Sequence, residues 1–240
     1  MITPQDNRPL LTIITVVLNN AAHLQATINS VLRQSYDNIE YIVVDGGSTD
    51  GTIDIIKKHA EHITKWISEK DSGIYDAMNK GVKLASGKYV NFLNAGDTLA
   101  NNNICSQLAK SIEPHGNKEY IYLLSVKRSD GKIINPIFPN FLRHYRLPTY
   151  HQGIVYPYTS LSNHPYPTHY KLVGDFFQYF QITAQTPTIK VPLVWCCYDT
   201  TGVSSVNRKA LHIEFAKAYK ELSINPALQL FRKMRACIGI

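Results

Sequence analysis

The sequence predicts an α/β fold built on a Rossmann-type, largely parallel sheet. Residues 10–18 are apolar and rich in β-branched side chains, which is typical of a strand buried on both faces of such a sheet. Residues 39–44 form a second buried run that ends at Asp45. Between the two runs lies an amphipathic helix with its apolar face at Leu24, Ile28, Val31 and Leu32. This order is a βαβ unit with a right-handed crossover.

Length and composition agree with that fold class. A chain of 240 residues suits one large domain, or one domain with a small appendage, and 44% hydrophobic residues support a packed core. No stretch approaches the roughly 20 apolar residues of a membrane span, and the polar start is not expected to be a secretory signal. The four cysteines show neither a disulfide pattern nor a zinc spacing, which predicts a cytoplasmic setting.

The loop after the second strand reads GGSTDGT, residues 46–52. It is not a dinucleotide fingerprint, because that motif follows the first strand and opens the first helix. It is not an EF-hand loop either, because it lacks the alternating acids and the terminal glutamate. Ser48, Thr49 or Asp50 is expected to cap the helix that follows.

Residues 71–97 are the most informative part of the chain. Apolar side chains recur at spacings of three and four over residues 74–85, which predicts an amphipathic helix. Gly81 costs about 1 kcal/mol there relative to alanine, so we expect close packing or a ligand beside it. Residues 89–93 form another buried strand, which ends in the loop 94–97. Ligands of open α/β sheets lie beyond the carboxyl ends of strands, so this loop is a candidate site for a metal and a diphosphate.

These segments resemble glycosyltransferase family 2. Ala77, Asn79 and Gly81 match its AxNxG helix, and residues 43–52 match its VVDGGSTDGT motif. Residues 92–97, FLNAGD, resemble the DXD-type loop of colanic-acid-type exopolysaccharide transferases. The resemblance covers roughly residues 10–205 and implies a GT-A-like nucleotide-binding sheet, a mixed acceptor-side region and C-terminal helices. The chain departs from the usual loop at its first acid, which is Asn94.

The resemblance implies roles on the donor side. Asp45 would hydrogen-bond the uracil ring, and Gly46 would allow close approach of the base. Asp71 would face the nucleoside, with a helix N-cap as the alternative. A divalent cation, Mg²⁺ or Mn²⁺, would bind at Asp97 beside Asn94. The other donor-side residues are Thr15, Val17, Asn79 and Lys80, with core packing as the alternative for Val17.

The strict alternation of strands and helices stops beyond residue 97. A helix at residues 104–112 and a β-hairpin around Ser-Asp-Gly 129–131 are expected first. Residues 136–170 then hold six of the twelve prolines and eight aromatic side chains. Such a segment suits a wall for an acceptor sugar, because sugar rings lie on aromatic faces. A loop anchored by its own rings is the alternative.

His151 and Gln152 lie in a segment that resembles the family's HQ strand, which precedes its catalytic acid. By spacing, that acid is Asp175 in LVGDFFQYF, where it would act as general base. An N-cap of the following helix is the alternative. Many family members carry Glu-Asp here, whereas this chain has Gly174. Residues 202–204, Gly-Val-Ser, resemble a loop of related exopolysaccharide enzymes.

The excess positive charge lies in residues 206–240. Seven basic residues there face two glutamates, a net +5 of the +7 for the whole chain. The pattern predicts basic amphipathic helices that either contact the cytoplasmic face of a membrane or complete the domain. Nucleic-acid binding is not expected, because the charge is concentrated in this tail. One apolar helical face comprises Leu211, Phe215, Tyr219 and Leu222.

These features predict an inverting glycosyltransferase, with a nucleotide-sugar half at residues 1–97 and an acceptor half at residues 98–205. Its donor is expected to be a UDP-sugar, or else a GDP-sugar, and its acceptor a saccharide or polyprenyl-linked saccharide of a surface polysaccharide. One alternative is a non-catalytic protein that binds a nucleotide-sugar. Another is a sugar nucleotidyltransferase, which needs a phosphate loop rich in glycine where this chain has Leu-Asn-Asn, residues 18–20.

Overall fold

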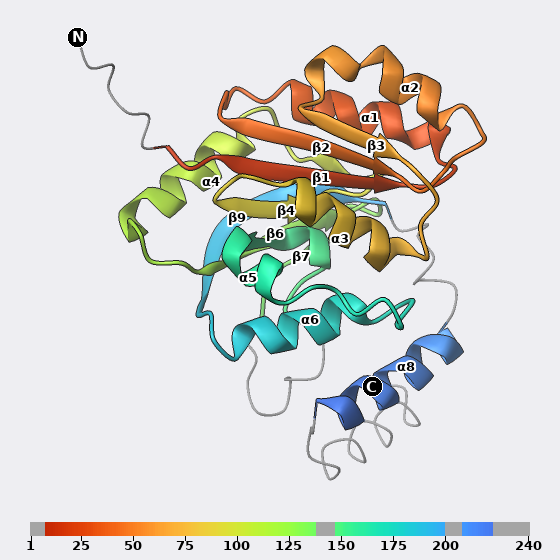
Figure 1. Cartoon of the computed structure of the whole chain (residues 1–240). Helices are drawn as coiled ribbons and strands as arrows, with labels where there is room; N and C mark the ends of the chain where they lie inside the picture. The colour runs from red at the N-terminus through yellow and green to blue at the C-terminus, as the bar shows by residue number, and fades with distance from the viewer. Residues whose placement is uncertain (1–7, 138–146, 200–207, 223–240) are drawn as a thin grey trace.

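The computed structural model describes residues 8–137, 147–199 and 208–222 (Figure 1). A mixed nine-stranded sheet runs through it in the order β3-β2-β1-β4-β8-β6-β9-β5, with β7 paired to β6. The first four strands are parallel and confirm the predicted βαβ start: β1 Leu11–Val17, β2 Ile39–Asp45, β3 Lys65–Ser68 and β4 Tyr89–Phe92.

The second half of the sheet is mixed, as predicted. β8 (Ile154–Pro157) pairs antiparallel with both β4 and β6 (Ile121–Arg128), and so joins the parallel strands to the rest. β9 (Thr188–Tyr198) runs parallel to β6 and pairs near its end with the short β5 (Thr98–Leu99). β7 (Ile133–Ile134) pairs antiparallel with β6, which confirms the expected hairpin.

A buried asparagine strengthens the junction between β4 and β8. The Nδ2 of Asn91 donates to the carbonyl oxygens of Gln152 and Ile154, both at 2.9 Å. Its Oδ1 accepts from Trp195 Nε1, also at 2.9 Å. Because a buried polar group is costly unless it is hydrogen-bonded, this fully used side chain favours one pairing of the strands.

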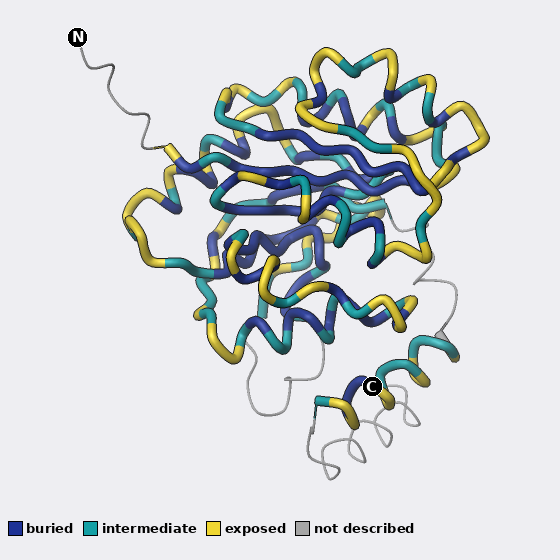
Figure 2. Tube along the Cα trace, in the orientation of Figure 1, coloured by how far each residue is buried: buried dark blue, intermediate teal, exposed yellow. Residues whose placement is uncertain are grey.

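Helices cover both faces of the sheet, so the fold has three layers (Figures 1 and 2). One apolar cluster holds the buried side of α1 Ala21–Leu32, α2 Thr52–Lys58 and α4 Ile104–Ile112. The other holds the buried side of α3 Ile74–Leu84, α5 Tyr158–Asn163, α6 Gly174–Thr183 and α8 Arg208–Glu221. Short 3-10 turns are η1 Ala60–His62, η2 Glu113–His115 and η3 His151–Gly153.

β1 is buried along its whole length and serves both layers. Leu11, Ile13 and Val17 belong to the cluster of α1, whereas Ile14 and Val16 belong to the cluster of α3. This alternation follows from the two-residue period of a strand. Each fully buried aliphatic side chain contributes about 1.5–3 kcal/mol, which explains why the apolar run forms the central strand.

Gly81 lets α3 approach the sheet closely. A Cβ at this position would lie 2.6 Å from Ile14 Cγ2 and 3.5 Å from Val44 Cγ2. Close packing, one of the two explanations that the sequence left open, therefore accounts for this glycine.

The five described aromatic side chains of residues 136–170 belong to the core or pack against it. Tyr156, Tyr166 and Tyr170 are at most 2% exposed and belong to the core. Tyr150 stacks on Tyr198, with ring centroids 4.5 Å apart. The rings therefore anchor their own segment, as the alternative held. Three further aromatic residues of the predicted wall lie outside the described residues: Phe138, Phe141 and Tyr145.

Residues 151–153 form a 3-10 turn and not the predicted strand. The N–H of Gly153 donates to the carbonyl of Tyr150 over 2.8 Å, which closes the turn, and β8 begins only at Ile154. A Cβ at Gly153 would lie 2.6 Å from the carbonyl oxygen of Leu124, so the turn passes close to β6.

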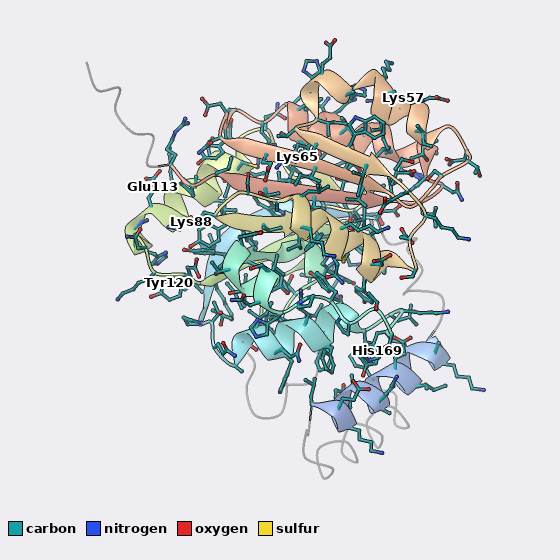
Figure 3. All side chains as sticks on the ribbon, viewed as in Figure 1. Lys57, Lys65, Lys88, Glu113, Tyr120 and His169 are labelled. Carbon is teal, nitrogen blue, oxygen red and sulfur yellow. The ribbon has the colours of Figure 1, made fainter. Side chains whose placement is uncertain are left out.

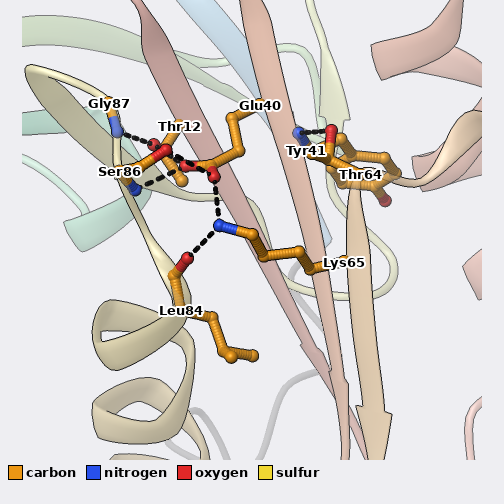
Figure 4. A network of polar contacts seen from close by, with 8 residues as sticks. All are labelled: Thr12, Glu40, Tyr41, Thr64, Lys65, Leu84, Ser86 and Gly87. Atoms are coloured by element: carbon orange, nitrogen blue, oxygen red, sulfur yellow. Dashed lines mark hydrogen bonds and ion pairs between the residues drawn. The ribbon is translucent and has the colours of Figure 1, made fainter.

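A polar network lies at the amino-terminal end of β2 (Figure 4). Glu40 is buried, and its carboxylate accepts from Lys65 Nζ, from Thr12 Oγ1 and from both the N–H and the hydroxyl of Ser86, at 2.7–2.8 Å. Burial alone would raise the pKa of Glu40, but these bonds outweigh it and lower the pKa to about 2. The network holds β1, β2, β3 and the end of α3 together.

α8 completes the second helical layer. Phe215 and Tyr219 pack edge to face against Phe176 of α6, with ring centroids 5.2 and 5.6 Å apart. The apolar face of α8 is thus packed against the domain, as the alternative of a domain-completing helix held, and membrane contact through its basic side chains stays a prediction. Among the described residues, no helix has the length and apolar character needed to cross a membrane. The predicted features at residues 202–204 and 223–240 lie outside the described residues.

Candidate active site

The carboxyl ends of β1, β2 and β3 meet at Asp45, the last residue of β2. Asp45 is fully buried, and its Oδ2 accepts from Gly47 N–H (3.1 Å), Ser48 N–H (3.0 Å) and the hydroxyl of Ser68 (2.7 Å). Its Oδ1 has no partner among the described residues. A buried acceptor of this kind calls for water or a ligand N–H.

Asp71 lies against Gly46, so the structure brings three predicted donor residues together. A Cβ at Gly46 would overlap Asp71 Oδ2. Asp71 Oδ1 accepts from the N–H of Gly73 at 2.9 Å, and Gly73 is the N-cap of α3. The N-cap alternative for Asp71 is therefore wrong.

Asp50 binds the first turn of α2 but is not its N-cap, which is Gly51, so the expected capping role is corrected. Its carboxylate accepts from the N–H and the hydroxyl of Thr52, at 3.1 and 2.6 Å, in the first turn of α2. It also accepts from the N–H of Ala21 at 3.0 Å, where α1 starts. Asp50 thus ties the starts of two helices together.

Thr15 and Val17, the two predicted nucleotide contacts in β1, are both buried. Thr15 is fully buried, its hydroxyl donates to the carbonyl of Leu93 at 2.8 Å, and it lies 3.1 Å from Tyr41 Oη. The side chain of Thr15 therefore supports the sheet, and its contact with the nucleotide, which was expected largely through backbone groups, stays a prediction. Val17 is buried and its carbonyl accepts from Gly46 N–H at 2.9 Å. Its contact with the nucleotide stays a prediction.

Asn79 binds the backbone of Tyr166, and its predicted role on the donor side stays a prediction. Its Nδ2 donates to the carbonyl of Tyr166 at 2.9 Å, and its Oδ1 accepts from the N–H of the same residue at 2.8 Å. Lys80 Nζ lies 2.9 Å from Glu69 Oε1 and 3.6 Å from Asp76 Oδ2. The bond with Glu69 raises the pKa of Lys80. Its role toward a diphosphate stays a prediction.

The predicted metal ligand Asp97 is buried, with 3% of its surface exposed. Its Oδ2 accepts from Gln152 Nε2 at 2.8 Å, and its Oδ1 accepts from the N–H of Asp199 at 2.9 Å. Burial raises the pKa of Asp97 to about 7, although both hydrogen bonds act to lower it. Asp97 therefore anchors its loop from within, and Gln152 is its support.

The described residues do not build a complete metal site at this loop. No group of three His, Cys, Asp or Glu side chains among them could hold an ion. Asn94 Oδ1 lines the loop and is buried without a partner among residues 8–137, 147–199 and 208–222. Asp199 Oδ2 also lines it, 3.2 Å from a Cβ built at Gly96. Sequence reasoning missed Asp199, because it follows β9, far from the loop in sequence.

Asp175 is the second residue of α6 and is partly exposed. Its Oδ1 accepts from Tyr75 Oη at 3.1 Å and from the N–H of Phe176 at 2.8 Å. Burial raises the pKa of Asp175 to about 6, although both bonds act to lower it. The N-cap of α6 is Val173, so the N-cap alternative for Asp175 is wrong. A carboxylate with this pKa suits a general base near neutral pH.

Gly174 fits the space beside that carboxylate. A Cβ at this position would lie 2.7 Å from Tyr75 Cε2. The second acid found here in many family members would collide with this ring. Sequence reasoning placed Tyr75 on the apolar face of α3 and missed its bond to Asp175, because such a tyrosine looks like an ordinary core residue.

Aromatic rings connect Asp175 to the loop after β4. Tyr75 stacks on Tyr166 at 5.7 Å, Tyr166 meets Phe92 at 5.5 Å, and Phe92 lies 5.9 Å from the ring of His151. Burial lowers the pKa of His151 to about 4, so this side chain is neutral at pH 7. These buried rings thus form a continuous packed chain from Asp175 to the turn that supports the Asp97 loop.

An open cavity of about 590 Å³ lies between α4, β9 and the β6–β7 hairpin. Its lining includes Ile104, Lys127 and Leu193 and none of the candidate site residues. The candidate carboxylates therefore do not belong to this cavity.

The sequence profile described as "Glycosyl transferase family 2" matches residues 12–161. The chain belongs to this family. It is 33% identical over 172 residues to a "PGL/p-HBAD biosynthesis glycosyltransferase" of Mycobacterium bovis, covering 70% of this chain and 67% of the relative. It is 28% identical over 204 residues to an "Uncharacterized glycosyltransferase" of Mycobacterium tuberculosis, covering 82% and 78%. The chain is therefore a glycosyltransferase.

Solved structures of low identity share its GT-A fold. S. aureus TarS 1-349 in complex with UDP has a TM-score of 0.68 at 17% identity, covering 87% of this chain and 63% of that one. The mannosyltransferase PcManGT from Pyrobaculum calidifontis, in complex with GDP-Man and Mn²⁺, has a TM-score of 0.69 at 17% identity, covering 91% and 65%. This chain thus spans somewhat less than two thirds of each solved chain.

Proposed function

We propose that this glycosyltransferase transfers a sugar with inversion from a UDP-sugar to a hydroxyl group of a saccharide or polyprenyl-linked saccharide. The observation that carries the proposal is the Asp175 carboxylate, which is held by Tyr75 and has its pKa raised to about 6. A single positioned base suits inversion, because one displacement by an activated hydroxyl inverts the anomeric carbon.

Asp175 acts in this mechanism as the general base. Its carboxylate takes the proton of the acceptor hydroxyl as the oxygen attacks the anomeric carbon, from the face opposite the diphosphate. The bond between that carbon and the diphosphate oxygen breaks, and the nucleoside diphosphate leaves. The protonated carboxyl keeps its hydrogen bond to Tyr75 and later releases the proton to solvent.

The corner formed by Asp45, Gly46 and Asp71 is proposed to bind the uridine. The unpartnered Oδ1 of Asp45 can accept the imide N–H of uracil, while its Oδ2 stays fixed by three protein donors. The UDP in the TarS complex supports a uridine donor. The GDP-Man in the mannosyltransferase complex makes a GDP-sugar the second candidate.

A divalent cation, Mg²⁺ or Mn²⁺, is proposed to accompany the donor, as the Mn²⁺ of the mannosyltransferase complex suggests. Asp97 is already engaged by the protein, since each of its oxygens accepts from one donor, and it would bind the ion only through a remaining lone pair. Asn94 Oδ1 would contribute one ligand, and the diphosphate would supply others. The bound ion would offset charge on the leaving diphosphate.

The acceptor is proposed to belong to surface polysaccharide synthesis of the colanic-acid type, at the cytoplasmic face of the membrane. The resemblance of residues 92–97 and the basic charge of residues 206–240 support this proposal. With the apolar face of α8 covered, any membrane contact would depend on its basic side chains and on the residues that follow.

The test compares the parent with Asp175→Asn, using a panel of UDP- and GDP-sugars with saccharide acceptors, with and without Mn²⁺. Loss of the base is expected to lower turnover by about 100-fold or more and to leave UDP binding unchanged by calorimetry. Turnover of the variant close to that of the parent would remove Asp175 from the mechanism. Binding of UDP by a parent without transfer to any acceptor would favour the non-catalytic alternative.

A further inference from the structure

Glu214 of α8 contacts the backbone immediately before the candidate base. Its Oε2 accepts from the N–H groups of Leu172 at 2.8 Å and Val173 at 3.2 Å. The N–H of Lys171 lies within 3.0 and 3.1 Å of its two carboxylate oxygens. One carboxylate thus accepts from three successive backbone donors. Such charge-assisted hydrogen bonds are roughly twice as strong as neutral ones.

The three donors belong to the turn that opens α6. Val173 is the N-cap residue of α6 and makes no side-chain capping bond of its own. The start of a helix has N–H groups without intrahelical partners and favours negative charge. Glu214 supplies that charge from a helix that lies about forty positions later in the sequence. Asp175 follows Val173 by two positions, so a shift of this turn moves the base with it.

Further contacts dock α8 on the same stretch. His169 Nε2 lies 3.3 Å from Glu221 Oε2, and Figure 3 shows His169 beside α8. Lys217 Nζ lies 5.3 Å from the ring centroid of Tyr170. Two rings of α8 pack against Phe176. The helix therefore contacts the chain on both sides of Asp175, and Glu214 provides its hydrogen bonds to the backbone that precedes the base.

We propose that Glu214 is a positioning residue for sugar transfer, which fixes the turn at residues 171–173 and so holds Asp175 against Tyr75. The proposal rests on the proposed role of Asp175 as base. Misplacement by about 1 Å can lower a rate 100-fold, so a loosened turn lowers turnover. Donor binding is unaffected, because the uridine corner is built by β2 and the loops after β2 and β3.

The experiment uses the full chain with three substitutions. Glu214→Ala removes the acceptor from all three N–H groups and is expected to lower kcat about tenfold or more, with the Kd for UDP within about twofold of the parent. Glu214→Gln keeps a side-chain oxygen that can accept from the turn and should restore kcat to within about threefold. Glu221→Ala is the matched control, because it removes a carboxylate from the same helix and should leave kcat unchanged.

Hydrogen exchange at the amides of residues 171–173 provides a readout that does not depend on transfer. Exchange there is expected to accelerate in Glu214→Ala and to stay as in the parent in Glu221→Ala, while thermal unfolding shows that each variant is folded. If Glu214→Ala does not fold, Glu214→Asp replaces it with the same expected results, because its shorter side chain cannot reach all three donors.

The outcomes separate this proposal from the proposed function. The positioning role is overturned if Glu214→Ala keeps the kcat of the parent, or if its kcat falls without faster exchange at residues 171–173. In either case an inactive Asp175→Asn variant leaves the proposed function standing. A fall in UDP affinity that accounts for the loss of activity also overturns the positioning role. Parent-like kcat in Asp175→Asn overturns the proposed function instead, and with it the reason for Glu214 to matter.

Discussion

The hydroxyl of Tyr75 donates to Asp175 Oδ1 over 3.1 Å and joins residues 100 positions apart in the sequence. Tyr75 comes from α3, between two parallel strands of the first half, whereas Asp175 comes from α6 in the second half. This bond acts to lower the pKa of Asp175 against the effect of burial. The first half of the chain thereby helps to set the proton affinity of the candidate base.

Replacing Tyr75 by phenylalanine is expected to shift the pH dependence of transfer. The base must be ionised to accept a proton, so the rate of the parent should rise with pH through about 6, the pKa of Asp175. Tyr75→Phe removes a bond that stabilises the ionised form, which raises this pKa further. The acidic limb of kcat/KM should therefore move to higher pH, with rates near those of the parent at pH 8 or above.

Tyr166→Phe is the matched control for that profile. Tyr166 stacks on Tyr75, and its hydroxyl has no hydrogen-bond partner among the described residues, so its loss leaves the bond to Asp175 in place. If the acidic limb of kcat/KM lay at the same pH in Tyr75→Phe as in the parent, the limb could not be assigned to the ionisation of Asp175.

Gly46→Ala is expected to weaken UDP binding by about tenfold, because the added Cβ displaces the carboxylate of Asp71 from the uridine corner. The same substitution in an Asp71→Ala background should have a smaller effect, since the overlapping atoms are gone. Calorimetry on the four proteins gives the coupling free energy, expected at about 0.5–3 kcal/mol for groups in contact. Additive effects would show that the two residues act independently.

Asp97→Ala distinguishes a support of the loop from a metal ligand. The substitution leaves Gln152 Nε2 and the N–H of Asp199 without their acceptor. We expect UDP-sugar affinity to fall by about tenfold to the same extent with Mn²⁺ and with EDTA, because the loop loses its internal anchor. A loss seen only when Mn²⁺ is present would instead make Asp97 a ligand of the ion.

Glu40→Gln is expected to lower stability without lowering transfer. The hydrogen bonds of Glu40 to Lys65, Ser86 and Thr12 depress its pKa to about 2, so its ionised form stabilises the fold above the usual glutamate pKa of 4.5. That contribution is lost as pH falls through about 2. The parent should exceed the variant in free energy of unfolding by about 1–3 kcal/mol at pH 7, and the difference should shrink below pH 4.5.

Denaturant unfolding at several pH values measures that difference, and kcat at pH 7 is the companion measurement. Glu40 and Asp45 lie five positions apart in β2, about 17 Å along the strand. If a fully folded Glu40→Gln protein had a lowered kcat, the network at the start of β2 would not be independent of the candidate site at the end of β2.

Local patterns predicted the first half of the fold well. Residues 10–18, 39–44 and 74–85 have the period and composition of the elements that they form, and the glycines at 46 and 81 lie where close approach requires them. Asp45 and Asp71 could be placed near each other because parallel strands end at one edge of a sheet.

The errors arose where one local pattern fits two structures. The bonds of Asn79 to the backbone of Tyr166, 87 positions away, could not be read from the AxNxG motif that it matches. The rings of residues 136–170 could line a groove or fill a core by composition alone. The contacts of Asp175 with Tyr75, and of Glu214 with the turn before α6, join distant segments, so no periodicity reveals them.

The pairing of β8 with β4 limits how this enzyme can be recombined with its relatives. A chimera made by exchanging residues 1–97 would have to match β8 and also the three bonds of Asn91, whose partners Gln152, Ile154 and Trp195 all come from the other half. Exchange of residues 1–97 alone is therefore not expected to transfer donor preference from one relative to another. Substitutions in the loops after β2 and β3 leave the pairing of β4 with β8 and the bonds of Asn91 intact. They therefore offer a way to engineer donor preference.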